Sequence, residues 1–162
     1  DWLRRTKKSG KPFFLWFAPA AMHQQIHVPP EFQGKTGHSL YADGLLHLDA
    51  IVGKLLKELD DLGLADNTIV MFTSDNGVNL AHWPQAGTPS FRGEKGTTWD
   101  GGFRVPMFVR WPGKVAPNTW TGEFMTSEDW LPTLMAAAGV AQLPRLRKQT
   151  PQLGQAHSEV FT

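Results

Sequence analysis

The sequence predicts an α/β fold with a partial, mixed or mostly parallel sheet flanked by helices. Thr68–Phe72 is rich in β-branched and aromatic residues, which indicates a strand buried on both faces. A second apolar run, Phe13–Phe17, has the same character. A long amphipathic pattern directly precedes the Thr68 strand. Helix, short turn and strand in this order are typical of layered α/β domains.

The amphipathic pattern predicts a helix between Ser39 and Leu62 that packs against the sheet. Its apolar residues recur at spacings of three and four, as one face of a helix requires. Gly63 is the expected C-cap, and Asp66-Asn67 forms the turn into the strand. The apolar face consists of Tyr41, Leu45, Leu48, Val52, Leu55, Leu59 and Leu62.

Two further elements are predicted downstream. Val105 to Trp111 reads as a strand that begins near Pro106 and is closed by a Pro-Gly turn. A helix is expected from about Asp129 to Ala138, because Pro132 is tolerated only in a first turn. Residues 1–140 therefore form the ordered domain, and residues 141–162 form an irregular tail without periodicity.

Composition narrows the classes of function. The chain has 162 residues, the size of one domain, and a net charge of +1, which gives no reason to expect nucleic acid as a partner. The absence of cysteine excludes disulfides, zinc-thiolate sites and a cysteine nucleophile within this chain. No apolar run approaches the roughly 20 residues of a membrane span.

A polar turn carrying Asp75 and Asn76 follows the Thr68 strand. In open α/β sheets ligands bind beyond the carboxyl ends of the strands, where this turn falls. A carboxylate and a carboxamide offer hard oxygen atoms suited to Ca²⁺ or Mg²⁺. The plain structural alternative is an Asx turn that closes the strand.

Two cationic candidates lie in loops. His23 follows the Phe13–Phe17 run, and Lys95 lies in the glycine-rich stretch Phe91–Gly96. A hard cation, a lysine, the arginine Arg92 of the same loop and a histidine together describe a site for a tetrahedral oxyanion, sulfate or phosphate. Lys95 would neutralise anionic oxygens, and His23 would donate a proton to the leaving oxygen. Ordinary solvated surface residues are the alternative for both.

Four motifs follow one another along the chain: Thr73–Gly77 (TSDNG), Phe91–Gly96 (FRGEKG), Trp99–Pro106 (WDGGFRVP) and Arg110–Gly113 (RWPG). In this order they resemble the sulfatase family, which has the fold of the alkaline phosphatase superfamily. The resemblance extends over roughly Lys11 to Val140. It is to the later part of the catalytic domain, so the N-terminal half of that domain is expected to be absent from this chain.

The resemblance implies roles for individual residues. Asp75 and Asn76 would ligate a single divalent cation, usually Ca²⁺, with Mg²⁺ as the alternative. Lys95 would contact the sulfate group and the leaving oxygen. Arg92, Asp100 and Arg104 would shape the loop rather than take part in the chemistry.

The family histidine that contacts the sulfate or protonates the leaving group corresponds to His23. The family often has proline before this histidine, whereas Met22 stands here, so His27 is the fallback. His82 and Trp83, in a variable loop, are candidates for substrate contact.

The family nucleophile is a formylglycine made from cysteine or serine in a C/S-x-P-x-R motif, which this chain lacks. The formylglycine and two further metal-binding aspartates are therefore expected upstream, outside the chain. The fragment by itself is expected to be inactive, and the parent protein to be periplasmic or secreted, as family resemblance implies.

Alternative functions remain open from the sequence. A phosphoester or phosphonate hydrolase of the same superfamily would typically carry Asp-His in place of Asp75-Asn76, and imidazole suits zinc or manganese better than a carboxamide does. A non-catalytic anion-binding fragment or pseudoenzyme is the rival from another class. Aryl sulfates, sulfated glycans and sulfolipids are all compatible substrates.

Overall fold

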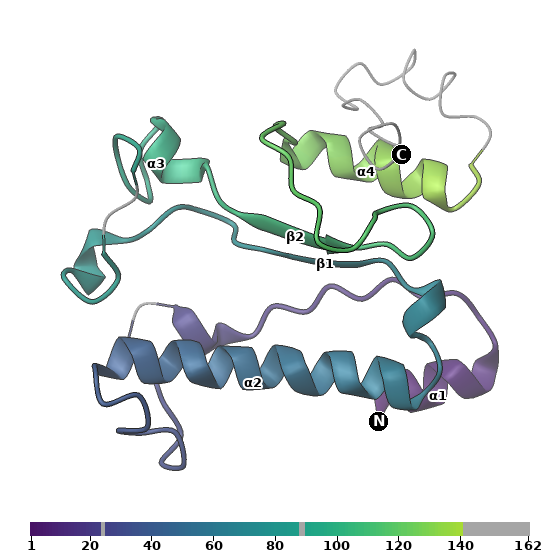
Figure 1. Ribbon diagram of the computed structural model, residues 1–162, viewed down its shortest axis with the longest axis horizontal. Coiled ribbons are helices and arrows are strands. Elements are labelled where there is room, and N and C mark those ends of the chain that lie inside the picture. The colour runs from purple at the N-terminus through teal and green to yellow at the C-terminus, as the bar shows by residue number, and fades with distance from the viewer. Residues whose placement is uncertain (24, 88–89, 141–162) are drawn as a thin grey trace. The chain divides into compact units, whose positions relative to one another are not determined.

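The computed structural model of the protein describes residues 1–23, 25–87 and 90–140. The chain forms two compact units, Asp1–Val109 and Arg110–Thr162. The predicted tail at 141–162 lies outside the described residues, so the predicted boundary at residue 140 stays a prediction. The elements are α1 (Trp2–Ser9), η1 (Ala20–Met22), α2 (Leu40–Asp61), η2 (Ala65–Asn67), β1 (Val70–Thr73), η3 (Leu80–His82), α3 (Asp100–Phe103), β2 (Met107–Arg110) and α4 (Ser127–Ala137) (Figure 1).

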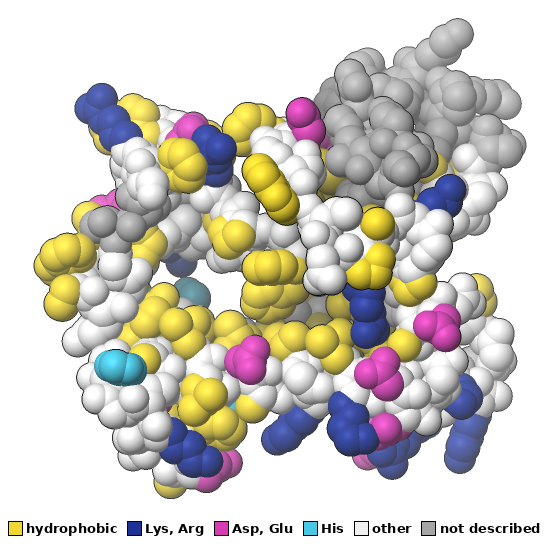
Figure 2. All heavy atoms as spheres, viewed as in Figure 1, with side chains coloured by type: hydrophobic (Ala, Val, Ile, Leu, Met, Phe, Trp, Pro, Cys, Tyr) yellow, Lys and Arg dark blue, Asp and Glu magenta, His cyan; other side chains and the backbone are white. Residues whose placement is uncertain are grey.

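Helix α2 confirms the predicted amphipathic helix. Ser39 is its N-cap, and the Ser39 Oγ accepts a hydrogen bond from the Ala42 backbone N at 3.1 Å. The helix ends at Asp61, and its C-cap is Leu62 rather than the predicted Gly63. Gly63 follows the cap with a φ of 60°, the left-handed conformation that glycine adopts readily. Its apolar face is only partly covered: Leu59 is buried, but Leu45 is exposed. Figure 2 shows hydrophobic side chains at the surface along α2.

The loop before α2 is held to the helix by the buried carboxylate of Asp43. That carboxylate accepts hydrogen bonds from the Thr36 N, the Thr36 Oγ1 and the Gly34 N at 2.9, 2.7 and 2.7 Å. These hydrogen bonds, those from Thr36 first, hold the pKa of Asp43 below its ordinary value. The first turn of α2 is thereby tied to the chain that leads into it.

Strands β1 and β2 form a two-stranded sheet and run antiparallel (Figure 1). The Thr73 Oγ1 donates to the Pro106 O at 3.1 Å, and the rings of Phe72 and Phe108 lie 6.4 Å apart. The expected mostly parallel sheet is not confirmed, since the described residues contain this sheet alone. The prediction that β1 is buried on both faces is wrong, because Phe72 and Thr73 are exposed.

The strand predicted at Phe13–Phe17 does not form in the structure. Phe14 is 72% exposed and Trp16 is 77% exposed. A strand is stabilised by the ladder of a neighbouring strand, and the described residues supply none for this segment. The prediction that this apolar run is buried is therefore wrong for both side chains.

In the second unit, α4 begins at Ser127, two residues before the predicted start near Asp129. A capping box explains the difference, because the Thr126 N and the Thr126 Oγ1 both donate to Asp129 Oδ2 at 3.0 Å. Pro132 therefore lies inside the helix rather than in its first turn. Among the described residues, no helix is both long and apolar enough to cross a membrane.

Candidate functional site

The turn after β1 carries the predicted cation ligands. Asp75 is exposed and Asn76 is half-buried. The Asn76 Nδ2 donates to the Gly77 O at 2.8 Å, so the amide oxygen is the atom left for a cation. The Ser74 Oγ donates to the Asn76 O at 3.0 Å and closes the turn. The turn therefore presents a carboxylate and a carboxamide oxygen from consecutive residues.

The loop that carries Lys95 is hydrogen-bonded to this turn. The Lys95 backbone N donates to the Val78 O at 2.8 Å, and the Gly77 N donates to the Gly102 O at 2.8 Å. Lys95 is half-buried. Backbone hydrogen bonds thus bring Asp75, Asn76 and Lys95, separated by some twenty positions in the sequence, onto one framework.

Glycines allow the segments of this framework to approach one another. A Cβ at Gly77 would lie 1.9 Å from the Gly101 O. A Cβ at Gly101 would lie 2.2 Å from the Gly93 O, and one at Gly102 would lie 2.2 Å from the Thr97 O. Backbone thus packs directly on backbone, and no residue with a side chain fits at these positions. The glycines of the predicted motifs set the geometry of the candidate site.

Two arginines of the same region form cation–π contacts with aromatic rings. The Arg92 guanidinium lies 4.0 Å from the centroid of the Trp99 ring, and that of Arg104 lies 4.1 Å from the centroid of Phe91. Arg104 also forms an ion pair with Asp100 at 3.5 Å. These contacts join side chains within the loop, and the expectation that neither arginine takes part in the chemistry stays a prediction.

His23 lies directly after η1 and is exposed. The segment around it rests on α2 at Gly44, where a Cβ would lie 3.1 Å from the Met22 Sδ and 3.0 Å from the Ile26 Cγ2. Among the described residues, no hydrogen bond or ion pair joins His23 to Asp75 or Lys95. The roles of His23, and of the fallback His27, stay predictions.

The described residues contain no group of three or more His, Cys, Asp or Glu able to hold a metal ion. Asp75 and Asn76 fit Ca²⁺ or Mg²⁺ in the type of donor atom, because both cations prefer oxygen ligands. Ca²⁺ takes about 6–8 oxygen ligands, so these two residues make up only part of a cation site.

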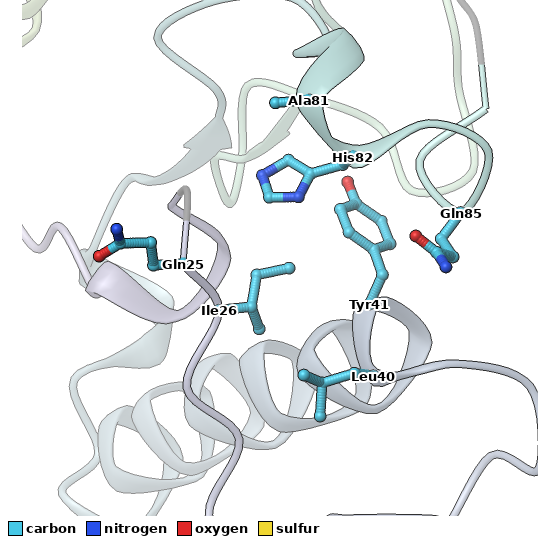
Figure 3. Close-up of a pocket in the computed structure, with 7 residues that line it drawn as sticks. All are labelled: Gln25, Ile26, Leu40, Tyr41, Ala81, His82 and Gln85. Atoms are coloured by element: carbon cyan, nitrogen blue, oxygen red, sulfur yellow. The ribbon is translucent and has the colours of Figure 1, made fainter.

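A cavity of about 380 Å³ lies in the first unit (Figure 3). It is lined by residues 25–26, by Leu40 and Tyr41 in the first turn of α2, and by Ala81, His82 and Gln85. The rings of Tyr41 and His82 lie 5.5 Å apart within it. Sequence reasoning selected His82 but assigned Tyr41 to the face packed on the sheet. It missed Gln25 and Gln85, because polar residues in aperiodic loops give no signal of a shared cavity.

Comparison with known proteins decides the family. The family profile described as Sulfatase matches residues 1–140. The chain belongs to the sulfatase family. Arylsulfatase A from Bos taurus is 41% identical over 147 residues, covering 90% of this chain and 29% of that protein. Steryl-sulfatase from Rattus norvegicus is 39% identical over 150 residues, covering 89% of this chain and 26% of that protein.

Solved sulfatase structures share the fold. The PsFucS1 sulfatase from Pseudoalteromonas sp. superposes with a TM-score of 0.84 at 28% identity, covering 99% of this chain and 32% of that one. Ps i-CgsB in complex with k-i-k-neocarrahexaose superposes with a TM-score of 0.83 at 28% identity, covering 96% of this chain and 34% of that one. This sulfatase chain thus spans roughly a third or less of the relatives it matches.

Proposed function

We propose that this chain forms part of a sulfuric ester hydrolase of the arylsulfatase type, acting on a sulfated small molecule or glycan. The observation that carries the proposal is the backbone framework that joins the Asp75-Asn76 turn to the Lys95 loop through the bonds Lys95 N to Val78 O and Gly77 N to Gly102 O. A turn with two oxygen donors for a cation and a half-buried ammonium group, joined by these backbone hydrogen bonds, suit the anionic tetrahedral group of a sulfate ester.

The proposed roles follow from charge and geometry. Asp75 and Asn76 would hold Ca²⁺, with Mg²⁺ as the alternative, and that cation supplies positive charge to the oxygens of the sulfate group. Lys95 stabilises the negative charge on the sulfate and on the leaving oxygen. His23 donates the proton that the leaving oxygen needs. The proposal includes a formylglycine nucleophile and further cation ligands supplied from outside this chain.

A comparison of variants in the complete protein that carries this chain tests the proposal. Asp75→Ala should weaken Ca²⁺ binding, measured by calorimetry, and lower kcat for 4-nitrophenyl sulfate by about 10²–10³-fold, as loss of an electrostatic contact to a transition state does. Lys95→Ala should lower kcat similarly but leave Ca²⁺ binding intact. Asp66→Ala and Lys54→Ala, at exposed positions on η2 and α2, are the matched controls.

The same assay separates the alternatives. Faster hydrolysis of 4-nitrophenyl phosphate than of 4-nitrophenyl sulfate would assign the site to phosphate esters. Tight sulfate binding without turnover would indicate a non-catalytic anion site. If Asp75→Ala kept both its Ca²⁺ affinity and its rate, the proposed cation site would be wrong.

A further inference from the structure

The turn after β1 contains the one asparagine of this chain that is followed by glycine, Asn76-Gly77. We propose that this pair is a latent deamidation site, which the backbone contacts of Gly77 with Gly101 and Gly102 keep unreactive while they stay closed. These contacts are called the backbone interlock below. The proposal goes beyond the proposed function, and its test reads a covalent change in the protein rather than the hydrolysis of an ester.

Deamidation of such a pair is an attack of the backbone on the preceding side chain. The Gly77 N forms a bond to the Asn76 Cγ and loses its proton to water. The bond between Cγ and Nδ2 breaks, and this nitrogen leaves as ammonia with a proton taken from water. Water then opens the resulting succinimide at either of its carbonyl groups. The product is aspartate or isoaspartate at position 76, with no change of oxidation state.

The packing of Gly77 explains why a labile pair stands at this position. A Cβ at Gly77 would lie 1.9 Å from the Gly101 O, so no residue with a side chain fits there. Glycine is also the residue that exposes the preceding asparagine most to attack, because it has no Cβ to hinder the approach and its backbone is the most mobile. The close packing of the turn therefore carries a chemical liability.

The interlock blocks the path of the attack. In the succinimide, Cγ occupies the place on the Gly77 nitrogen that the amide hydrogen holds before the reaction. That hydrogen points at the Gly102 O, to which the Gly77 N donates at 2.8 Å. The Asn76 Cγ can reach the nitrogen only after this hydrogen bond has opened and Gly102 has moved aside.

Further hydrogen bonds hold the remaining groups of the reaction. The Asn76 O accepts from the Ser74 Oγ at 3.0 Å, so the peptide group between Asn76 and Gly77 is held at its oxygen as well as at its nitrogen. The leaving nitrogen is also held, because the Asn76 Nδ2 donates to the Gly77 O at 2.8 Å. Rotation of this peptide group toward Cγ must break contacts at both of its ends.

Deamidation would make the opening permanent. Isoaspartate carries the main chain through Cγ and lengthens it by one methylene group, so Gly77 no longer meets Gly101 and Gly102 in register. Either product also adds a negative charge beside Asp75. A single opening of the interlock that leads to reaction therefore alters the turn irreversibly.

The test uses the complete protein that carries this chain, incubated at neutral pH and sampled by peptide mapping with mass spectrometry. Asn76 in the folded protein should deamidate at least about tenfold more slowly than in the same protein unfolded in guanidinium chloride, because a backbone hydrogen bond must open first. Thr119→Gly is the matched control, since it places a second Asn-Gly pair at the exposed Asn118. Within the described residues the Thr119 N donates no hydrogen bond, so this pair should react at close to the unfolded rate.

Opening the interlock should remove the protection. In Gly102→Ala the new Cβ would lie 2.2 Å from the Thr97 O, so position 102 must move and deamidation at Asn76 should approach the unfolded rate. Hydrogen exchange in the unmodified protein measures the same opening without a variant, should Gly102→Ala fail to fold. Exchange of the Gly77 amide should be slowed by about the same factor as deamidation, because one local opening governs both.

Equal rates at Asn76 and at Asn118 of the control variant would overturn the inference. Rapid deamidation at Asn76 together with a protected Gly77 amide would overturn it as well. Chelation of divalent cations with EDTA should leave the reaction at Asn76 slow. If chelation instead raises it to the unfolded rate, a bound cation protects the site, and the interlock inference is wrong while the proposed cation site gains support.

Discussion

The close approach of Gly77 to Gly101 makes a sharp prediction about the candidate site. In Gly77→Ala the new Cβ would lie 1.9 Å from the Gly101 O, whereas ordinary contacts begin near 3.4 Å. The two backbones must therefore separate by about 1.5 Å to relieve the clash. That separation strains the hydrogen bonds Gly77 N to Gly102 O and Gly101 N to Arg92 O, which are 2.8 and 2.7 Å long.

The loss of stability in Gly77→Ala follows from the steric clash and from the strained hydrogen bonds. Overpacking of a rigid region costs about 1–3 kcal/mol. Two weakened backbone hydrogen bonds add about 1 kcal/mol each. We therefore expect Gly77→Ala to lower the free energy of unfolding by about 3–5 kcal/mol. Ca²⁺ affinity should fall by about 10–100-fold, as it does when groups that orient metal ligands are lost.

Gly53→Ala is the matched control, because Gly53 lies inside α2 with no atom within 4 Å of the position of its new Cβ. The same chemical change there should raise stability by about 0.5–1 kcal/mol, since alanine favours a helix. Urea unfolding of the complete protein and Ca²⁺ calorimetry measure both effects. A Gly77→Ala protein with unchanged urea midpoint and Ca²⁺ affinity would refute the proposed backbone interlock.

Three further predictions concern α2 and the exposed surface. Ser39→Ala removes the acceptor of the Ala42 N–H and should cost about 1 kcal/mol in urea unfolding, whereas Ser39→Asp should restore most of it; equal losses in both would contradict a capping role. In the folded protein the pKa of Asp43 is lowered from 3.8, so the stabilisation by its carboxylate is complete above about pH 4 and is lost as the pH falls through the lower folded pKa. A pH series of thermal melts should therefore lack this acid-induced loss of stability in Asp43→Asn. An unchanged pH profile in that variant would contradict the role of the Asp43 carboxylate. Phe14 and Trp16 are exposed, so the isolated 162-residue chain should bind the dye ANS and self-associate. Trp16→Ser should reduce both the ANS fluorescence and the self-association. A monomeric chain without ANS fluorescence would contradict this prediction.

Local pattern was sufficient for the elements that depend on their own residues. The three- and four-residue spacing from Tyr41 to Leu62 predicted α2, because amphipathic periodicity is a property of neighbouring positions. Gly63 was expected as the C-cap and follows the actual C-cap, Leu62, by one residue. The motif order along the chain also predicted the family. The start of α4 was placed two residues late because Pro132 outweighed a capping box that the sequence already contains at Thr126 and Asp129.

The same local patterns of apolar residues did not predict which side chains are buried. Phe13–Phe17 is as apolar as a buried strand, yet it stays outside any sheet, because a strand needs a neighbour from a distant part of the chain. The expected parallel sheet is not confirmed either, because it too depends on which distant segments pair. Strand pairing is non-local, and hydrophobicity does not encode the partner or its direction.

By itself, the sequence determined the chemistry available to this protein: the oxygen donors of Asp75 and Asn76, the charge of Lys95, and the glycines around them. Only the tertiary structure decided how these are held together, through backbone contacts between Gly77 and Gly101 that no Cβ would permit. It alone assembled Gln25, Tyr41 and His82 around one cavity. The physical reason is that a residue type is a local property, whereas close approach between distant segments depends on the whole packed chain.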